Sequence, residues 1–182
     1  MEITSLVRAL RTRLSCWRRV WGCCSSSKAV AFSVEATTHT RRQQPTRARS
    51  TEESRFNDTY GHEAGNVVLA SIGSMLKEHV RISDMAFRYG GEEFTVLLPD
   101  GDTATGIERA ETIRNAAHEL HLHYNGKTLP HVTLSLGVAH YPLHGTTDAA
   151  LLDAADAALY RSKQGGRDRV ESAGAALTLH NQ

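Results

Sequence analysis

Apolar residues recur every three or four positions in three stretches of the chain, which is the spacing of an amphipathic helix. The first stretch carries Val68, Ile72, Met75 and Leu76, the second Ile107, Ala110, Ile113 and Leu120, and the third Leu152, Ala155 and Leu159. Asp102 and Asp148 stand where the second and third helices would begin, and Gly165-Gly166 would end the third. The pattern therefore predicts three helices, each with one face buried.

Alternating apolar and polar positions predict strands between these helices. The clearest strand is 131–139, whose alternate residues face one way: Val132, Leu134, Leu136 and Val138. Residues 84–89 and 94–99 predict two short strands with Gly90-Gly91 as the hairpin turn between them, and a last strand begins at Arg169-Val170. The order of elements predicts an α/β (α+β) fold with helices against a mostly antiparallel sheet.

The composition is that of a water-soluble globular protein, with 40% hydrophobic and 23% charged residues in a chain of 182. That length suits one domain. No run approaches the ~18 apolar residues of a membrane-spanning helix, so we expect no transmembrane segment. The three cysteines, Cys16, Cys23 and Cys24, lie together near the N-terminus, so the rest has no disulfide framework. We expect a reducing, cytoplasmic location.

Charge is distributed unevenly along the chain. Residues 1–50 hold ten Lys/Arg and two acids, whereas residues 51–182 hold eleven Lys/Arg and eighteen Asp/Glu. We therefore divide the chain into a basic segment at 1–54, a domain at 55–172 and a tail at 173–182.

The basic segment shows no sustained periodicity. Three interpretations stay open: a disordered tail, a targeting or membrane-surface segment, or a stretch that is not native coding sequence for the domain. Ten cations could also hold nucleic-acid phosphates without sequence preference. The segment has no nucleic-acid motif and the acidic remainder opposes such binding, so we expect no nucleic-acid partner.

Two glycines and two acids stand together at 90–93. A glycine pair at a hairpin tip lets the backbone come close to a ligand. Adjacent residues of a strand point to opposite faces, so Glu92 and Glu93 should have different roles. Hard carboxylate oxygens suit Mg²⁺, which a phosphate-handling site requires. A plain hairpin with a solvated acidic tip is the alternative.

Three blocks of the sequence, FNDTYGHEAG, RYGGEEF and ADAALYRSKQGGRDR, resemble in order and spacing the GGDEF family of diguanylate cyclases. The resemblance runs from about Phe56 to about Val170. It implies a sheet like the palm of nucleotide cyclases and polymerases, flanked by helices. It also implies condensation of two GTP molecules into cyclic di-GMP, with Mg²⁺ or Mn²⁺, by a homodimer in which each domain holds one GTP.

The resemblance also assigns roles to individual residues. It implies Glu92 as a metal ligand that helps deprotonate the 3′-hydroxyl, Glu93 as the second catalytic acid, and Gly90 and Gly91 as the point where the backbone meets GTP. Asn57 and Asn66 would contact the guanine, while Lys163 and Arg167, projecting from one end of the last helix, would contact the phosphates. We assign His62 to the turn and helix start rather than to chemistry.

Arg81 and Asp84 match the RxxD motif of family members that their own product inhibits. An arginine fork can chelate a phosphate or stack on guanine, and the carboxylate can accept from the guanine edge. The alternative is a local ion pair at the surface.

The chain departs from the family pattern in the segment before Asn57. Arg49 and Ser54 stand where the family has a metal-binding Asp and a Lys, and a cation at the first position would repel Mg²⁺. The flanking segment cannot form an apolar strand, so the first central strand should be missing, as a frameshift, wrong start or fusion would produce. The run AVAFSV at 29–34, followed by Glu35, could stand in only across a long loop.

A further departure concerns guanine recognition. Asn66 replaces an Asp that accepts two guanine N–H groups, which predicts weaker selectivity for GTP. The intact signature and the altered strand leave two functional hypotheses, a diguanylate cyclase of impaired activity and a non-catalytic cyclic di-GMP sensor that uses Arg81 and Asp84. A truncated, poorly folded product is a third possibility.

Overall fold

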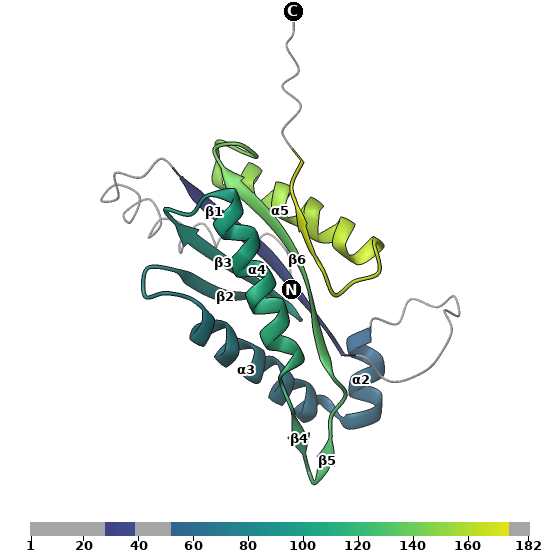
Figure 1. Ribbon diagram of the computed structural model, residues 1–182. Coiled ribbons are helices and arrows are strands. Elements are labelled where there is room, and N and C mark those ends of the chain that lie inside the picture. Colours follow the sequence, from purple (N-terminus) through teal and green to yellow (C-terminus); the bar gives the residue numbers. More distant parts are fainter. Residues whose placement is uncertain (1–27, 39–51, 175–182) are drawn as a thin grey trace, which may run out of the picture.

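The computed structural model describes residues 28–38 and 52–174, with side chains from residue 56 in the second range (Figure 1). Predictions for Arg49, the cysteines and residues 175–182 lie outside these ranges. The elements in chain order are β1 (Ala29–Thr38), α2 (Glu52–Tyr60), α3 (His62–His79), β2 (Met85–Gly90), β3 (Glu93–Pro99), α4 (Thr103–His118), β4 (His123–Tyr124), β5 (Lys127–Thr128), β6 (Val132–Tyr141), α5 (Asp148–Gln164) and β7 (Val170–Ser172).

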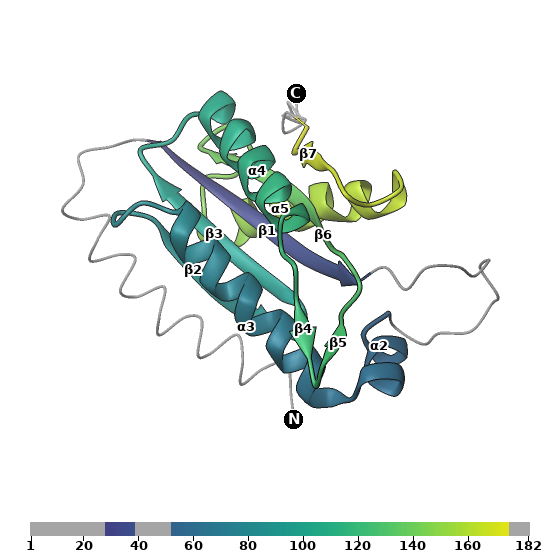
Figure 2. The ribbon, with the colours of Figure 1, turned by 60° about the horizontal axis from the view of Figure 1, so that its bottom comes forward.

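Five of these strands form one sheet in the order β2-β3-β1-β6-β7. All neighbouring pairs are antiparallel except β6 and β7, which are parallel. Helices α3 and α4 cover one face of the sheet and α5 covers the other (Figures 1 and 2). The predicted α+β class, a mostly antiparallel sheet flanked by helices, is confirmed.

The central strand β1 corrects the expectation that the first central strand is missing, and it places residues 29–38 of the predicted basic segment within the domain. Residues 29–38 pair with β6 along their whole length, and 29–35 pair with β3. The apolar run at its start is what a strand buried on both faces requires. A long connection to α2 is tolerated because loop-closure entropy grows only slowly with loop length.

Hydrophobic residues fill the spaces on both faces of the sheet. The larger core lies under α3 and α4 and includes the alternate residues predicted for β6: Val132, Leu134, Leu136 and Val138. The smaller core lies under α5 and includes Ala31, Leu97, Ala139 and Leu151. The predicted alternation of β6 is therefore confirmed, and β1 contributes to both cores.

The three predicted helices are α3, α4 and α5. Asp102 caps α4 as predicted, since its side chain accepts a hydrogen bond from the Thr105 amide at 2.8 Å. Helix α5 begins at Asp148 as predicted, with Thr147 as its N-cap, and Leu151 is more deeply buried than the predicted Leu152. Helix α2 and the β4–β5 hairpin, around the predicted turn at 124–127, were not expected as regular elements.

Helix α5 lies unusually close to the sheet at Gly137. A Cβ atom there would stand 2.1 Å from the Ala155 carbonyl oxygen and 2.2 Å from the Leu159 amide nitrogen. The glycine lets the backbones of α5 and β6 approach each other. This approach fixes the last turn of α5, which carries Lys163, against β1.

Candidate functional site

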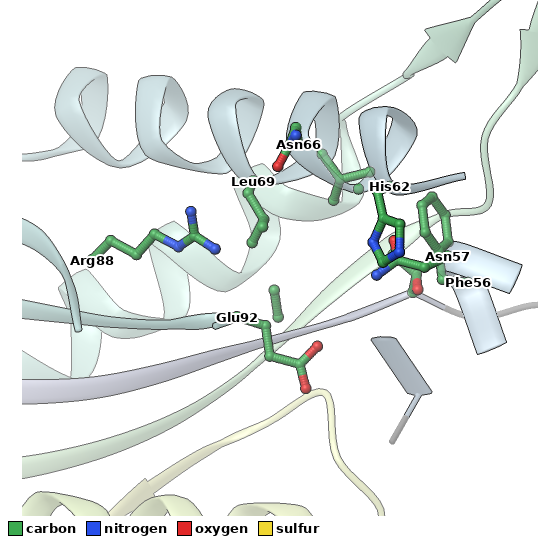
Figure 3. Close-up of a pocket in the computed structure, with 11 residues that line it drawn as sticks. Phe56, Asn57, His62, Asn66, Leu69, Arg88 and Glu92 are labelled. Carbon is green, nitrogen blue, oxygen red and sulfur yellow. The ribbon is translucent and has the colours of Figure 1, made fainter. Parts of the chain in front are cut away.

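A cavity of about 100 Å³ opens between α2, α3 and the tip of the β2–β3 hairpin (Figure 3). Its wall combines apolar residues with polar ones from β1, α2, α3, β2 and the turn that follows β2. It is lined by Ala36, Thr38, Phe56, Asn57, His62, Gly65, Asn66, Val68, Leu69, Arg88 and Glu92. Of the predicted site residues, the structure thus brings Asn57, Asn66 and Glu92 to one cavity.

Asn57 is the most informative residue of the cavity. It lies in α2, and its carbonyl oxygen accepts a hydrogen bond from the Gly61 amide at 2.8 Å. Its side-chain Oδ1 is buried and has no hydrogen-bond partner among the described residues. A buried acceptor left unpaired costs about 1–3 kcal/mol, so this oxygen is prepared to accept a bond from a ligand.

Gly65 determines how the Asn57 amide can lie. A Cβ atom at Gly65 would stand 2.6 Å from Asn57 Oδ1, closer than real Cβ contacts come. The absence of a side chain on this turn of α3 therefore leaves the space that the amide oxygen occupies. No local pattern of residues signals this contact, because it joins two helices.

His62 and Asn66 lie one turn apart on α3 and line the same wall of the cavity (Figure 3). His62 begins α3, as assigned from the sequence, but its contribution to the cavity was missed. Arg88 was also missed. Its Nε donates a hydrogen bond to the Gly91 carbonyl oxygen at 2.7 Å and so braces the hairpin tip.

Glu92 and Glu93 take different sides of the hairpin, as predicted. Glu92 lines the cavity, and its carbonyl oxygen accepts a hydrogen bond from the Ala36 amide at 3.2 Å. Glu93 begins β3 and stands directly opposite Glu35 of β1 in the strand register. The two hairpin acids therefore belong to two adjoining parts of the site.

Glu35 and Glu93 form a pair of carboxylates beside the last turn of α5. Lys163 Nζ donates a hydrogen bond to Glu35 Oε2 in an ion pair, with the Lys163 side chain 27% and the Glu35 side chain 13% exposed. Partial burial and then the charge of Glu35 raise the pKa of Glu93, with Asp156 adding to the rise and Lys163 opposing it. Negative charge is therefore concentrated where a cation could relieve it.

Arg167 follows α5 rather than belonging to it, which corrects the expectation that it projects from the helix with Lys163. Helix α5 ends at Gln164, and Arg167 lies in the next loop with a left-handed backbone, φ +61°. Its amide donates to the Ser162 carbonyl oxygen at 3.1 Å. Lys163 is therefore held by the helix and Arg167 by the loop.

The remaining predicted residues lie at two turns. Gly90 ends β2, and Gly91, with φ +45°, begins the turn that leads to Glu92. Asp84 accepts a hydrogen bond from the Arg81 amide at 2.8 Å in the turn between α3 and β2. Arg81 is exposed, and neither Arg81 nor Asp84 lines the cavity.

Neither a cluster of metal-binding side chains nor a membrane-spanning helix occurs within residues 28–38 and 52–174. In these ranges no cluster of three or more His, Cys, Asp or Glu side chains is arranged to hold a metal ion. The same ranges contain no helix with the length and apolar character to cross a bilayer.

Comparison with known proteins gives concordant matches. The sequence model described as diguanylate cyclase, GGDEF domain, matches residues 54–169. Diguanylate cyclase A of Treponema denticola is 43% identical over 115 residues, which cover 63% of this chain and 31% of that protein. The response regulator PleD of Caulobacter vibrioides is 38% identical over 117 residues, 64% of this chain and 26% of that protein. The chain thus spans about a third or less of these relatives.

Solved structures match a longer part of the chain. The GGDEF domain of PA1120 (YfiN or TpbB) from Pseudomonas aeruginosa superposes with a TM-score of 0.74 at 28% identity, covering 92% of this chain and 94% of that one. The GGDEF domain of DgcB from Caulobacter crescentus, solved in complex with c-di-GMP, gives a TM-score of 0.71 at 28% identity, covering 91% and 89%. The chain therefore belongs to the GGDEF family of diguanylate cyclase domains.

Proposed function

We propose that this chain condenses two GTP molecules into cyclic di-GMP and pyrophosphate, as a homodimer in the cytoplasm with Mg²⁺ or Mn²⁺. The observation that carries the proposal is the buried, unpaired Oδ1 of Asn57 in a cavity that Glu92 also lines. A hydrogen-bond acceptor in a cavity that an acidic residue also lines suits a purine base with its ribose beside it.

The guanine would occupy the cavity. Asn57 Oδ1 would accept from a guanine N–H, and Asn66 would present its amide from α3. Pockets for whole drug-sized ligands measure roughly 300–1,000 Å³, so about 100 Å³ holds the base alone and leaves ribose and phosphates along the hairpin tip. Asn66 offers one acceptor where an Asp offers two, so GTP should be preferred over ATP less strongly than with an Asp there.

The carboxylates of Glu35 and Glu93 fit a divalent cation. Mg²⁺ is commonly held by one or two carboxylates together with substrate phosphates and water, so a pair of acids suffices. The strand register supports Glu35 and Glu93 for this role. Glu92, which lines the cavity, would act as the base beside the ribose. When bound, the ion neutralises the triphosphate and lowers the pKa of the attacking hydroxyl.

Lys163 and Arg167 would bind the triphosphate, and Gly90 and Gly91 would let the backbone approach it. Glu92 accepts the proton of the 3′-hydroxyl of one GTP. That oxygen then forms a bond to the α-phosphorus of the GTP held by the partner domain, and the bond from this phosphorus to the pyrophosphate oxygen breaks. The two reactions close one cyclic dinucleotide, so most of the catalysis is positioning and charge stabilisation.

The test is a turnover assay on the full chain with GTP and Mg²⁺. We expect cyclic di-GMP from the wild type, none from Glu92→Ala, and wild-type turnover from Glu108→Ala, which removes an exposed acid of α4. No product from a folded wild type would refute the proposed enzyme. Equal turnover in Glu92→Ala would refute the role of Glu92.

A non-catalytic sensor of cyclic di-GMP is the second candidate. The carboxylate of Asp84 holds the turn that presents the exposed Arg81, an arrangement able to meet a phosphate and a guanine edge. Calorimetry with cyclic di-GMP separates the candidates. Binding that Arg81→Ala abolishes, with no turnover of GTP, would favour the sensor.

A further inference from the structure

We propose that Asp168, held by Arg114 and His118 of α4, is a positioning residue that sets Arg167 for triphosphate binding. This inference rests on the proposed function, because it assumes that Arg167 contacts phosphate. The feature that points to it is a loop whose backbone conformation is unusual and whose contacts reach across the molecule to α4.

The loop after α5 has an uncommon backbone. Arg167 and Asp168 are consecutive non-glycine residues in the left-handed region, with φ +61° and +47°, and Gly166 before them has φ +112°. Residues other than glycine rarely adopt this backbone conformation, and it persists where contacts with the surrounding structure hold it in place. The contacts that hold this backbone in place are therefore candidates for a functional role.

The carboxylate of Asp168 ties this loop to α4. Asp168 Oδ1 accepts a hydrogen bond from Arg114 Nη1 at 3.0 Å and lies 2.9 Å from His118 Nε2, one helical turn further along α4. The Arg114 guanidinium is itself fixed, because its Nε binds Glu111 Oε2 at 2.8 Å and its Nη2 binds Asn115 Oδ1 at 2.8 Å. Asp168 thus meets an oriented pair of donors.

The electrostatics of this contact keep the carboxylate charged. Burial alone would raise the pKa of Asp168, but the hydrogen bonds from His118 and Arg114 outweigh burial and hold that pKa below its ordinary value. The Asp168 carboxylate is therefore charged at neutral pH and makes its contact to α4 as an anion.

A second set of contacts holds the loop from the side of the sheet. The fully buried Ser162 donates from Oγ to the Arg169 carbonyl oxygen at 2.8 Å, and that oxygen also accepts from the Leu136 amide at 2.9 Å. The Arg167 amide binds the Ser162 carbonyl oxygen. The backbone on both sides of Asp168 is thus clamped to α5 and β6.

Asp168 therefore adds the connection to α4 that backbone contacts cannot supply. Arg167 Nε is buried, and its side chain leaves a left-handed backbone, so a change of φ at this residue would redirect the side chain. Loss of the Asp168 anion would let the two left-handed residues relax and would turn Arg167 away from its set position. The base cavity, formed by α2, α3 and the hairpin, would stay unchanged.

The experiment compares two ligands on the full chain in Mg²⁺ by calorimetry, GTP and guanosine. Asp168→Asn, which keeps the side-chain size, should bind GTP roughly tenfold more weakly and guanosine as the wild type does. Glu108→Gln changes an exposed acid of the same helix α4 without touching the loop and should leave both affinities unchanged. Arg114→Gln removes the same contact from the α4 side, and combined with Asp168→Asn it should add little further loss.

Each outcome decides the proposal. Unchanged GTP binding in Asp168→Asn would overturn it, and so would an equal loss for guanosine, which would mean general damage to the fold. Should Asp168→Asn not fold, the GTP-to-guanosine ratio of Arg114→Gln decides in its place. A wild type that binds guanosine but gains nothing from the triphosphate overturns this inference and the triphosphate role of Arg167, while the base cavity stands. A wild type that binds neither ligand refutes the proposed function, and this inference with it.

Discussion

The replacement Gly65→Ala tests the base cavity with a single methyl group. The new Cβ would stand 2.6 Å from Asn57 Oδ1, which is closer than the two atoms can approach. Because the obstacle is the end of a flexible side chain, the Asn57 amide should rotate away while α3 stays in place. The cavity would then lose the oxygen that we assign to a guanine N–H.

The expected loss follows from the burial of that oxygen. Loss of a hydrogen bond that leaves a buried polar group unpaired costs about 1–3 kcal/mol of binding free energy, which corresponds to roughly 5- to 150-fold weaker binding of guanosine. Calorimetry with guanosine measures this change without depending on turnover. Thermal unfolding of the same samples shows whether the fold has survived.

The matched control is Gly73→Ala in the same helix. Nothing lies within 4 Å of a Cβ atom at Gly73, and Gly73 does not line the cavity. Alanine in a helix interior is more stable than glycine by about 0.5–1 kcal/mol, so this variant should unfold later and bind guanosine normally. Wild-type guanosine affinity in Gly65→Ala would refute the assignment of Asn57.

Three further predictions concern the charged groups. The folded-state pKa of Glu93 lies above its ordinary 4.5, so protonated Glu93 contributes fully to stability below pH 4.5, and the contribution is lost as pH rises through the raised pKa. Glu93→Gln, which is never charged, should therefore increase Tm at pH 7, and an unchanged Tm would contradict the crowding of negative charge. Lys163→Met leaves Glu35 without its ion-pair partner and should lower the free energy of unfolding by about 1–3 kcal/mol. Adding Glu35→Gln should recover much of this loss, and free-energy changes of the two variants that simply add in the double variant would count against the pair. Asp168 has a folded-state pKa below its ordinary 3.8, so the stability that its carboxylate contributes is present above pH 3.8 and is lost as pH falls through the lowered pKa. The Tm of the wild type should therefore fall relative to that of Asp168→Asn as pH drops below 3.8, and parallel curves of Tm against pH would disprove the contact.

Local patterns predicted the elements whose burial is one-sided. Helix α3 buries Val68, Ile72, Met75 and Leu76 as their spacing indicates. In α5 the predicted Ala155 and Leu159 are buried, but in the first turn Leu151 is buried and the predicted Leu152 only partly, because small alanines mark the buried face weakly. Helix α2 offers only Phe56 and Tyr60 as an apolar pair one turn apart, which is too little to predict a helix, and both pack in the larger core.

The parts of the site that escaped prediction are contacts between elements distant in sequence. Gly65 and Asn57 meet only because α2 and α3 fold against each other. Arg88 reaches the cavity through the hairpin that its own guanidinium braces. Glu35 was recognised only as an acid that a long loop might bring into place, because no motif marks it.

The position of Glu35 follows from the burial of its own strand. In β1, Val30, Phe32 and Val34 enter the larger core, whereas Ala31 on the alternate face enters the smaller core under α5. A shift of the register by one residue would exchange the faces and drive the Glu35 carboxylate into the larger core without a partner. Hydrophobic burial therefore fixes the register, and the register in turn sets Glu35 opposite Glu93 and within reach of Lys163. An acid pair suited to a cation can arise in this way from the apolar pattern of a strand that lacks the family's metal-binding sequence.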